Sequence, residues 1–255
     1  LGPNYIDILK NKFGIILEAR MGSTRLPGKT MKNLLGKPMI ERILDRLFLS
    51  KLTDTIVVAT TENKKDDVLV SFLEQKEINY FRGSEDDVLK RVVEAAEHFS
   101  IQNIIELHGD NPFLDPDIID SCIREFELGD VDYLSNTLEN TFPQGLRVQI
   151  FPTIKLRRVE KTVDDETVRE HVSLYFYENP NKFKIKSVEA EDPIKRPELR
   201  LTVDTEEDFQ FICSIYERLL LEGIYPDFDV KDIIRIVDDY KISIVNKSIK
   251  SKPIR

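Results

Sequence analysis

Apolar runs and amphipathic segments alternate along the first half of the chain. Short apolar runs predict buried strands at residues 13–19, 55–60, 78–83, 103–110 and 131–136. Apolar positions at helical spacing predict helices at residues 37–52, 66–77, 84–99 and 116–129. The alternation indicates an α/β fold, in which a mostly parallel sheet has helices on both faces.

The order of elements changes after about residue 140. Strands are predicted at residues 146–151, 183–190 and 199–204, and helices at residues 167–180 and 206–220. We therefore expect one domain over residues 13–245. Its core comprises residues 13–140 and about 198–245, and a small α+β extension covers about 141–197 before the chain returns to the first sheet. The ends, residues 1–12 and 246–255, are expected to be flexible.

Composition narrows the class of protein. The 255 residues are 41% hydrophobic and 33% charged, and 37 basic against 46 acidic residues give a net charge of −9. An acidic chain lacks the footprint of a general nucleic-acid binder. It contains no apolar run of about 18 residues and no signal-peptide core, so no membrane association is expected. The distant Cys122 and Cys213 predict reduced thiols in a cytoplasmic protein.

One glycine-bearing loop, residues 22–30, looks like a phosphate-binding P-loop but has different spacing. Five residues separate Gly22 from Gly28, where a P-loop has four. The loop and its flank carry three cations, Arg20, Arg25 and Lys29, and follow a predicted strand. Cations and close backbone approach suit a polyphosphate, while a solvated basic surface loop is the alternative.

The order of residues in this loop narrows the choice. The segment A-R-M-G-S-T-R-L-P-G-K, residues 19–29, closely resembles the signature of cytidylyltransferases that make CMP-sugars, such as CMP-Kdo and CMP-sialic acid synthetases. The nearest likeness is to the spore coat polysaccharide biosynthesis protein F branch. Further blocks continue the resemblance in the family's order to about residue 212. It implies a Rossmann-like fold of the nucleotide-diphospho-sugar transferase type, similar to that of GT-A glycosyltransferases.

The resemblance implies a role for each matching residue. Arg20, Arg25 and Lys29 would hold the triphosphate of CTP, and Arg20 and Lys29 would act in catalysis together with Asp110. Asp110 and Asp204, both at predicted strand ends, would hold Mg²⁺, which favours carboxylate ligands. The implied nucleotide-binding residues are Ala19, Arg20, Gly22, Ser23, Arg25, Lys29, Arg82, Gly83 and Ser84. In contrast, Asp115, Asp117 and Thr205 are predicted to be turn or helix-cap residues.

Acceptor contacts are predicted from residues 167–180 and from two departures from the branch. Arg169 and His171 match a family block near the acceptor and the subunit interface. A packing or dimer helix is the alternative, because residues 172–177 are largely apolar. Arg147 and Gln149 stand where many relatives have acidic residues, which predicts an anionic acceptor group near Arg147 unless both side chains face solvent. His108 occupies a position that is often Gln or Thr in the family.

The predicted activity is transfer of CMP from CTP to a sugar acid or a related anionic acceptor, a phosphosugar or a phosphonate, with release of pyrophosphate. Surface polysaccharide synthesis, a Mg²⁺ cofactor, a homodimer and a cytoplasmic location are implied by the resemblance. Two alternatives stay open. One is a glycosyltransferase that uses a nucleotide sugar, with residues 85–87 as its acidic metal motif; the other is a regulatory protein that binds CTP without turnover.

Overall fold

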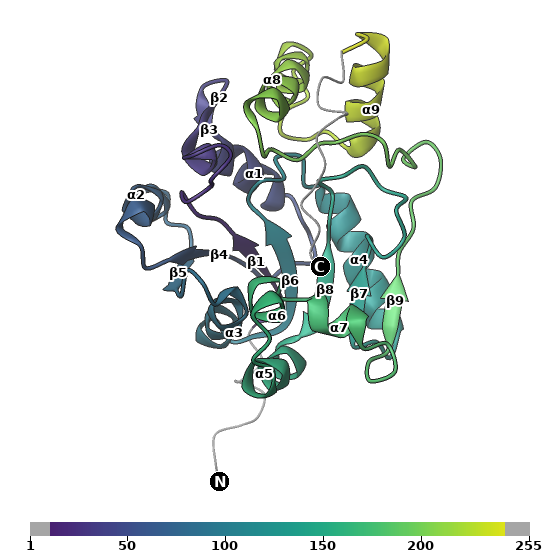
Figure 1. The fold of residues 1–255 in the computed structure, drawn as a ribbon. Helices are drawn as coiled ribbons and strands as arrows, with labels where there is room; N and C mark the ends of the chain where they lie inside the picture. The colour runs from purple at the N-terminus through teal and green to yellow at the C-terminus, as the bar shows by residue number, and fades with distance from the viewer. Residues whose placement is uncertain (1–10, 243–255) are drawn as a thin grey trace.

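The fold is organised around one seven-stranded sheet. The computed structural model describes residues 11–242, and its strand order is β5-β4-β1-β6-β8-β7-β9 (Figure 1). The strands are β1 (Asn11–Glu18), β4 (Thr55–Thr61), β5 (Tyr80–Gly83), β6 (Ile101–His108), β7 (Tyr133–Ser135), β8 (Gln149–Pro152) and β9 (Ile185–Ser187).

The pairing of the strands confirms the predicted mostly parallel sheet. Strands β5, β4, β1 and β6 are parallel to one another. β8 runs antiparallel to both of its neighbours, and β9 is again parallel to β7. The carboxyl ends of β4, β5, β1 and β6 therefore meet at one rim, where ligands of such folds bind.

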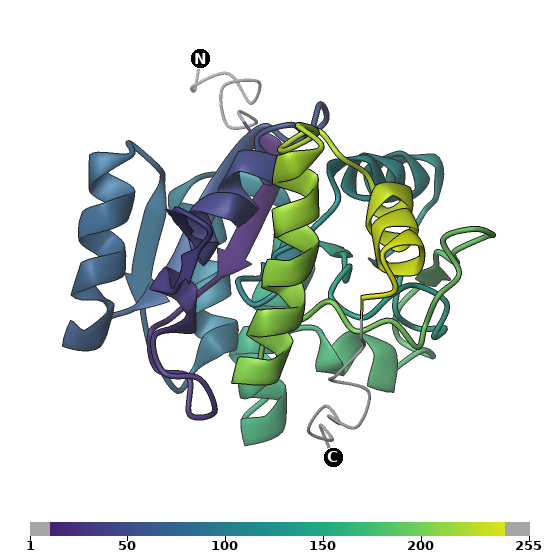
Figure 2. The same cartoon turned by 90° about the horizontal axis from the view of Figure 1, so that it is seen from above.

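Helices cover both faces of the sheet, and each face has its own apolar core (Figures 1 and 2). Alternation along β1 supplies both cores, because Ile15 and Leu17 belong to one cluster and Ile16 to the other. The first face holds α1 (Met39–Leu47), α2 (Asp67–Gln75), α4 (Pro116–Leu128), α8 (Glu206–Leu221) and α9 (Val230–Asp239). The second holds α3 (Val88–His98), α5 (Thr153–Thr162), α6 (Glu166–Glu170) and α7 (Leu174–Glu178).

The predicted extension contributes to the same sheet through β8, which pairs with β6, and β9, which pairs with β7. The predicted strand at 199–204 is wrong, since an isolated bridge between Gln144 and Arg200 is its only ladder contact in the part of the chain described. The backbone of this segment forms hydrogen bonds with loops and with a side chain instead. Val203 N donates to Asp110 O at 2.8 Å, and Val203 O accepts from Lys29 Nζ at 2.7 Å. Leu199, Leu201 and Val203 still pack in the first core, so this part of the chain returns to the core as a loop that leads into α8.

Other boundaries also differ from prediction. The predicted helix at 167–180 is instead two short helices, α6 and α7, separated by residues 171–173. Helix α3 begins after the N-cap Asp87 rather than after Ser84. The caps Asp115 and Thr205 are confirmed. Sequence patterns missed α5, α9, the hairpin of β2 (Asn33–Leu34) and β3 (Lys37–Pro38), and the 3-10 turns η1 (Lys29–Met31) and η2 (Lys64–Asp66).

The N-terminal boundary also differs from the prediction. Residues 11 and 12, predicted to belong to a flexible end, begin strand β1. The rest of that prediction, residues 1–10 and 246–255, lies outside the described residues. Within residues 11–242, no helix combines the length and the apolar character that crossing a membrane requires.

Candidate active site

A cleft of about 640 Å³ opens at the rim where β1 and β6 end. Its lining comes from the loop that follows β1 (residues 19–30, here called the first loop), from the residues after β6, from residues 136–147 and from the turn after α6. Of the predicted site residues, the cleft is lined by Ala19, Arg20, Gly22, Ser23, Arg25, Lys29, Asp110, Arg147, His171 and Asp204.

The first loop is held in shape by its own polar groups. Thr30 Oγ1 donates to Arg20 O at 2.8 Å, and Gly28 N donates to Met21 O at 3.2 Å. Gly28 has φ +73°, a left-handed conformation that glycine adopts without strain. Asp66, at the end of η2, accepts from Met21 N at 2.7 Å and ties the loop to the end of β4. The loop therefore presents its cations from a fixed backbone.

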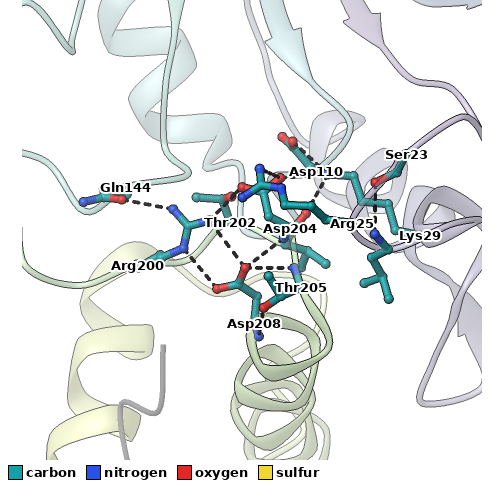
Figure 3. Close-up of polar contacts among 12 residues, drawn as sticks. Ser23, Arg25, Lys29, Asp110, Gln144, Arg200, Thr202, Asp204, Thr205 and Asp208 are labelled. Carbon is teal, nitrogen blue, oxygen red and sulfur yellow. Dashed lines mark hydrogen bonds and ion pairs between the residues drawn. The ribbon is translucent and has the colours of Figure 1, made fainter. Parts of the chain in front are cut away.

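Lys29 lies between the two predicted metal ligands. Its Nζ is 3.0 Å from Asp110 Oδ2 and 3.2 Å from Asp204 Oδ1, although 94 residues separate the two aspartates (Figure 3). The ammonium is mostly buried, with 12% of the side chain exposed. The fold thus brings Lys29, Asp110 and Asp204 together as the resemblance implied, and the two carboxylates converge on one cationic position.

Asp204 has more cationic partners than Asp110. Arg25 Nη2 lies 2.9 Å from its Oδ1, and Arg200 Nη2 lies 2.7 Å from its Oδ2. Burial alone would raise the pKa of Asp204, but the charges of Lys29 and Arg25 outweigh it and hold the pKa below its ordinary value. Arg200 in turn pairs with the fully buried Asp208, whose carboxylate also accepts from Asp204 N at 2.9 Å (Figure 3). Asp204 is thereby fixed as an ionised group.

Replacing Arg200 by methionine should lower the free energy of unfolding by about 3–5 kcal/mol, because it leaves the buried Asp208 carboxylate without its charge partner. Urea unfolding at pH 7 measures the change. Arg124→Met, on the exposed side of α4, should stay within about 0.5 kcal/mol of the wild type. A loss for Arg200→Met as small as that of the control would contradict this account.

The donor set at this point fits a divalent cation. Asp110 Oδ2 and Asp204 Oδ1 already share one cation. No cluster of three or more His, Cys, Asp or Glu side chains able to hold a metal occurs among residues 11–242. Two carboxylates leave the other coordination positions to water and phosphate oxygens, which is the usual arrangement for Mg²⁺.

Arg82, Gly83 and Ser84 are not brought into this cleft. They line a separate hollow of about 650 Å³ beside β5. Arg82 donates to Thr61 O at 2.9 Å, and its Nη1 lies 2.8 Å from Asp67 Oδ1. These bonds orient its guanidinium toward the β4–α2 turn. Ser84 Oγ accepts from Asp87 N at 3.0 Å, a local turn contact.

The two predicted acceptor residues of α6 separate in space. His171 lines the cleft, and burial lowers the pKa of its imidazole. Arg169 is not among the cleft residues, since it donates through Nε to Asp87 Oδ2 at 2.8 Å and through Nη1 to Val163 O at 2.9 Å. This pairing raises the pKa of Arg169 and joins α6 to the start of α3. The structure thus gives Arg169 a packing role, the alternative left open by the sequence.

The neighbouring apolar stretch has a similar explanation. Val172, Leu174 and Phe176 are buried within the chain's own second core. Their apolar character therefore gives no separate support for a subunit interface.

The departures at 147 and 149 face inward rather than toward solvent. Arg147 is half-buried and lines the cleft. Gln149 is buried, accepts from Ser173 Oγ at 2.7 Å and from the hydroxyl of Tyr133, and donates to Glu106 Oε2 at 3.1 Å. Gln149 is thus buried and is not among the cleft-lining residues, so of the two only Arg147 is presented to a ligand.

Sequence reasoning missed several cleft residues. Glu18 and Arg91 line the cleft but fall inside segments read as a buried strand and an amphipathic helix. Arg200 and Asp66 position cleft groups from outside it. One signal was available: Glu18 and Glu106 are acidic residues in runs predicted to be buried strands, where unpaired carboxylates are rare.

A mostly parallel sheet whose rim joins a cationic loop to two convergent carboxylates is the architecture of a nucleotidyltransferase. The family model described as "Cytidylyltransferase" matches residues 14–228. The chain belongs to this cytidylyltransferase family, and the enzyme is a CTP-dependent nucleotidyltransferase.

Individual relatives agree with this assignment. The spore coat polysaccharide biosynthesis protein SpsF of Bacillus subtilis (strain 168) is 33% identical over 89% of this chain and 95% of its own length. A 3-deoxy-manno-octulosonate cytidylyltransferase of Geobacter metallireducens is 27% identical over 66% of this chain and 62% of its own. The solved structure of a cytidylyltransferase from Leptospira borgpetersenii is similar with a TM-score of 0.87 and 32% identity, covering 94% of this chain and 99% of that one.

Proposed function

We propose that the enzyme transfers CMP from CTP to a small anionic acceptor, a sugar acid in the first instance, and releases pyrophosphate. The observation that carries the proposal is the Lys29 ammonium held between Asp110 and Asp204, with Arg25 beside it, in a cleft lined by the first loop. Relatives that bear the names SpsF and 3-deoxy-manno-octulosonate cytidylyltransferase support an acceptor used in surface polysaccharide synthesis.

The residues of the first loop would bind the triphosphate. Arg20, Arg25 and Lys29 place three cations on one side of the cleft, and Ser23 adds a hydroxyl. As an acceptor oxygen attacks the α-phosphorus, these cations would neutralise the charge that grows on the departing pyrophosphate. Positioning and charge neutralisation suffice for this step, so no covalent enzyme intermediate is needed.

Asp110 and Asp204 would hold Mg²⁺ once CTP is bound. When present, the ion would lower the pKa of the acceptor hydroxyl and screen the phosphate charges. The chain's own contribution is to keep both carboxylates ionised and convergent, which Arg200 and Arg25 do at Asp204. Lys29 would shift from the carboxylates toward the phosphates.

The acceptor would lie against Arg147 and His171, which line the same cleft as the first loop. A guanidinium there suits a carboxylate, phosphate or phosphonate of the acceptor. The expected homodimer and cytoplasmic location belong to the same proposal and rest on the resemblance to the family.

Changing Arg147 to methionine should raise the KM for the acceptor by about 10–100-fold, because a charge-assisted hydrogen bond is lost, while the KM for CTP changes little. Steady-state kinetics with each substrate varied in turn measures this split. Arg158→Met, an exposed arginine of α5, serves as the matched control. Equal effects on both KM values would remove Arg147 from the acceptor site.

Pyrophosphate release with CTP, Mg²⁺ and a panel of acceptors tests the proposal. The panel includes Kdo, nonulosonic acids, phosphosugars and aminoalkyl phosphonates. Release with one acceptor supports the proposal and names the substrate. Tight CTP binding with no release for any acceptor favours the regulatory alternative. Sugar transfer from a nucleotide sugar without pyrophosphate favours the glycosyltransferase alternative.

A further inference from the structure

Among the residues that line the cleft, three buried side-chain atoms have no hydrogen-bond partner in the part of the chain described: Oε1 of Glu18, Nε of Arg91 and Nε2 of His108. The first two belong to side chains of opposite charge, Glu18 and Arg91. Both residues line the cleft, one as the last residue of β1 and the other from the second turn of α3. A buried donor or acceptor without a partner is costly, so a pair that faces a cleft points to a ligand that supplies the partners.

Arg91 is a charged side chain held almost entirely inside the protein. It is 3% exposed, and burial lowers the pKa of its guanidinium. Its Nη1 donates to Ser84 O, which fixes the plane of the guanidinium against the turn before α3. The strongest charge acting on it is that of Glu18, yet no ion pair within 4.0 Å joins the two residues in residues 11–242.

Glu18 is oriented from behind by Glu106. The two side chains lie on the same face of adjacent strands, and Glu106 is fully buried. Burial, together with the charge of Glu18 and a hydrogen bond to it, raises the pKa of Glu106 well above its ordinary value. The raised pKa favours the protonated form of Glu106, while Oε1 of Glu18 has no partner among the described residues.

We propose that Glu18 and Arg91 read the edge of the cytosine base, with Glu18 accepting from the 4-amino group and Arg91 donating to the ring nitrogen or the 2-oxygen. The proposal rests on the proposed function, and it assigns the nucleobase specificity of that site. An acceptor and a donor side by side match the cytosine edge, which offers one donor beside two acceptors. Val88, which also lines the cleft, offers an apolar surface to the ring.

Glu18 and Arg91 would also discriminate against uracil. Uracil carries an oxygen where cytosine has the amino group, and this oxygen would face the Glu18 carboxylate. It also carries an N–H where cytosine has an acceptor, so it would face the Arg91 guanidinium with a donor. Both mismatches leave buried groups unpaired, which is the strongest source of discrimination between similar substrates.

The test is a comparison of nucleotide binding by isothermal titration calorimetry without acceptor. The ligands are CTP, UTP and the pyrimidin-2-one ribonucleoside triphosphate, which lacks only the 4-amino group. We expect wild type to bind CTP about 10–100-fold more tightly than the pyrimidin-2-one analogue. Glu18→Gln, which keeps the size of the side chain, should reduce the preference for CTP over UTP by a similar factor. Arg91→Lys should weaken CTP and the analogue alike.

Glu139→Gln is the matched control, because it makes the same change at an exposed carboxylate of the same cleft. It should keep the wild-type preference. If Glu18→Gln also keeps it, while CTP binding and turnover persist in wild type, the assignment of Glu18 is overturned and the proposed function stands. If wild type binds none of the nucleotides, the proposed function itself fails.

Discussion

Replacing Asp110 by asparagine should lower kcat by about 10²–10³-fold while the protein stays folded and still binds CTP. Asparagine keeps the size of the side chain and an oxygen that can accept from Lys29, which now contacts Asp110 at 3.0 Å. It removes one of the two charges that converge on the cation position. Removing one preorganised charged or polar group from a reaction centre lowers kcat by a factor of this order.

Pyrophosphate release under saturating CTP and acceptor measures the loss in Asp110→Asn. Asp117→Asn makes the same change at an exposed residue in the first turn of α4 and should keep full activity. Thermal unfolding of both variants establishes that they fold. A folded Asp110→Asn enzyme with activity within a factor of two of the wild type would remove Asp110 from the reaction.

The second large effect is expected for Lys29→Met, which should reduce kcat/KM for CTP by about 10²–10³-fold. The variant loses a cation that the loop directs at the phosphates, and before CTP binds it leaves Asp110 and Asp204 facing each other without the ammonium between them. Lys32→Met is the matched control, because Lys32 pairs with Glu206 outside the cleft.

The stability of Lys29→Met should also depend on pH. Lys29 helps to depress the folded-state pKa of Asp204, so its contribution is fully present above the unfolded pKa of about 3.9 and is lost as the pH falls through the depressed folded value. The gap in unfolding free energy between wild type and variant should be largest near pH 7 and shrink in acid. Urea unfolding at several pH values measures it, and a gap that grows in acid would contradict the ion-pair geometry.

The strands of the sheet were predicted correctly where an apolar run in the sequence is enough to specify a buried strand. Residues 55–60 and 103–108 are strands in the described fold because their apolar runs are buried on both faces, while residues 109 and 110 form the turn after β6. Residues 199–204 show where pattern fails, since their polar backbone groups bond a loop and the Lys29 side chain rather than a strand. Whether a segment pairs with a strand or with a loop depends on its tertiary contacts, and these cannot be read from the sequence of the segment alone.

The residues of the candidate site likewise fall into those that the sequence predicts and those that only the fold reveals. The cationic loop and the two aspartates could be predicted from the sequence because they match a motif and stand at strand ends. Arg169 is not among the cleft-lining residues, because a neighbouring carboxylate, Asp87, pairs with its guanidinium, and sequence spacing does not reveal that contact. Glu18 and Arg91 were missed because strand and helix patterns assigned them to the core, and only the fold shows that they border the cleft.

The most direct measurement follows the two ends of the triphosphate separately. The enzyme is incubated with Mg²⁺, an acceptor that supports turnover, and CTP labelled with ³²P at either the α- or the γ-phosphate. Cytidylyl transfer predicts that the α-label appears in a CMP–acceptor conjugate and the γ-label in pyrophosphate, in equal amounts, and that Asp110→Asn forms both about 10²–10³-fold more slowly. Label from the γ-phosphate in the acceptor, or hydrolysis of CTP without any conjugate, would contradict cytidylyl transfer.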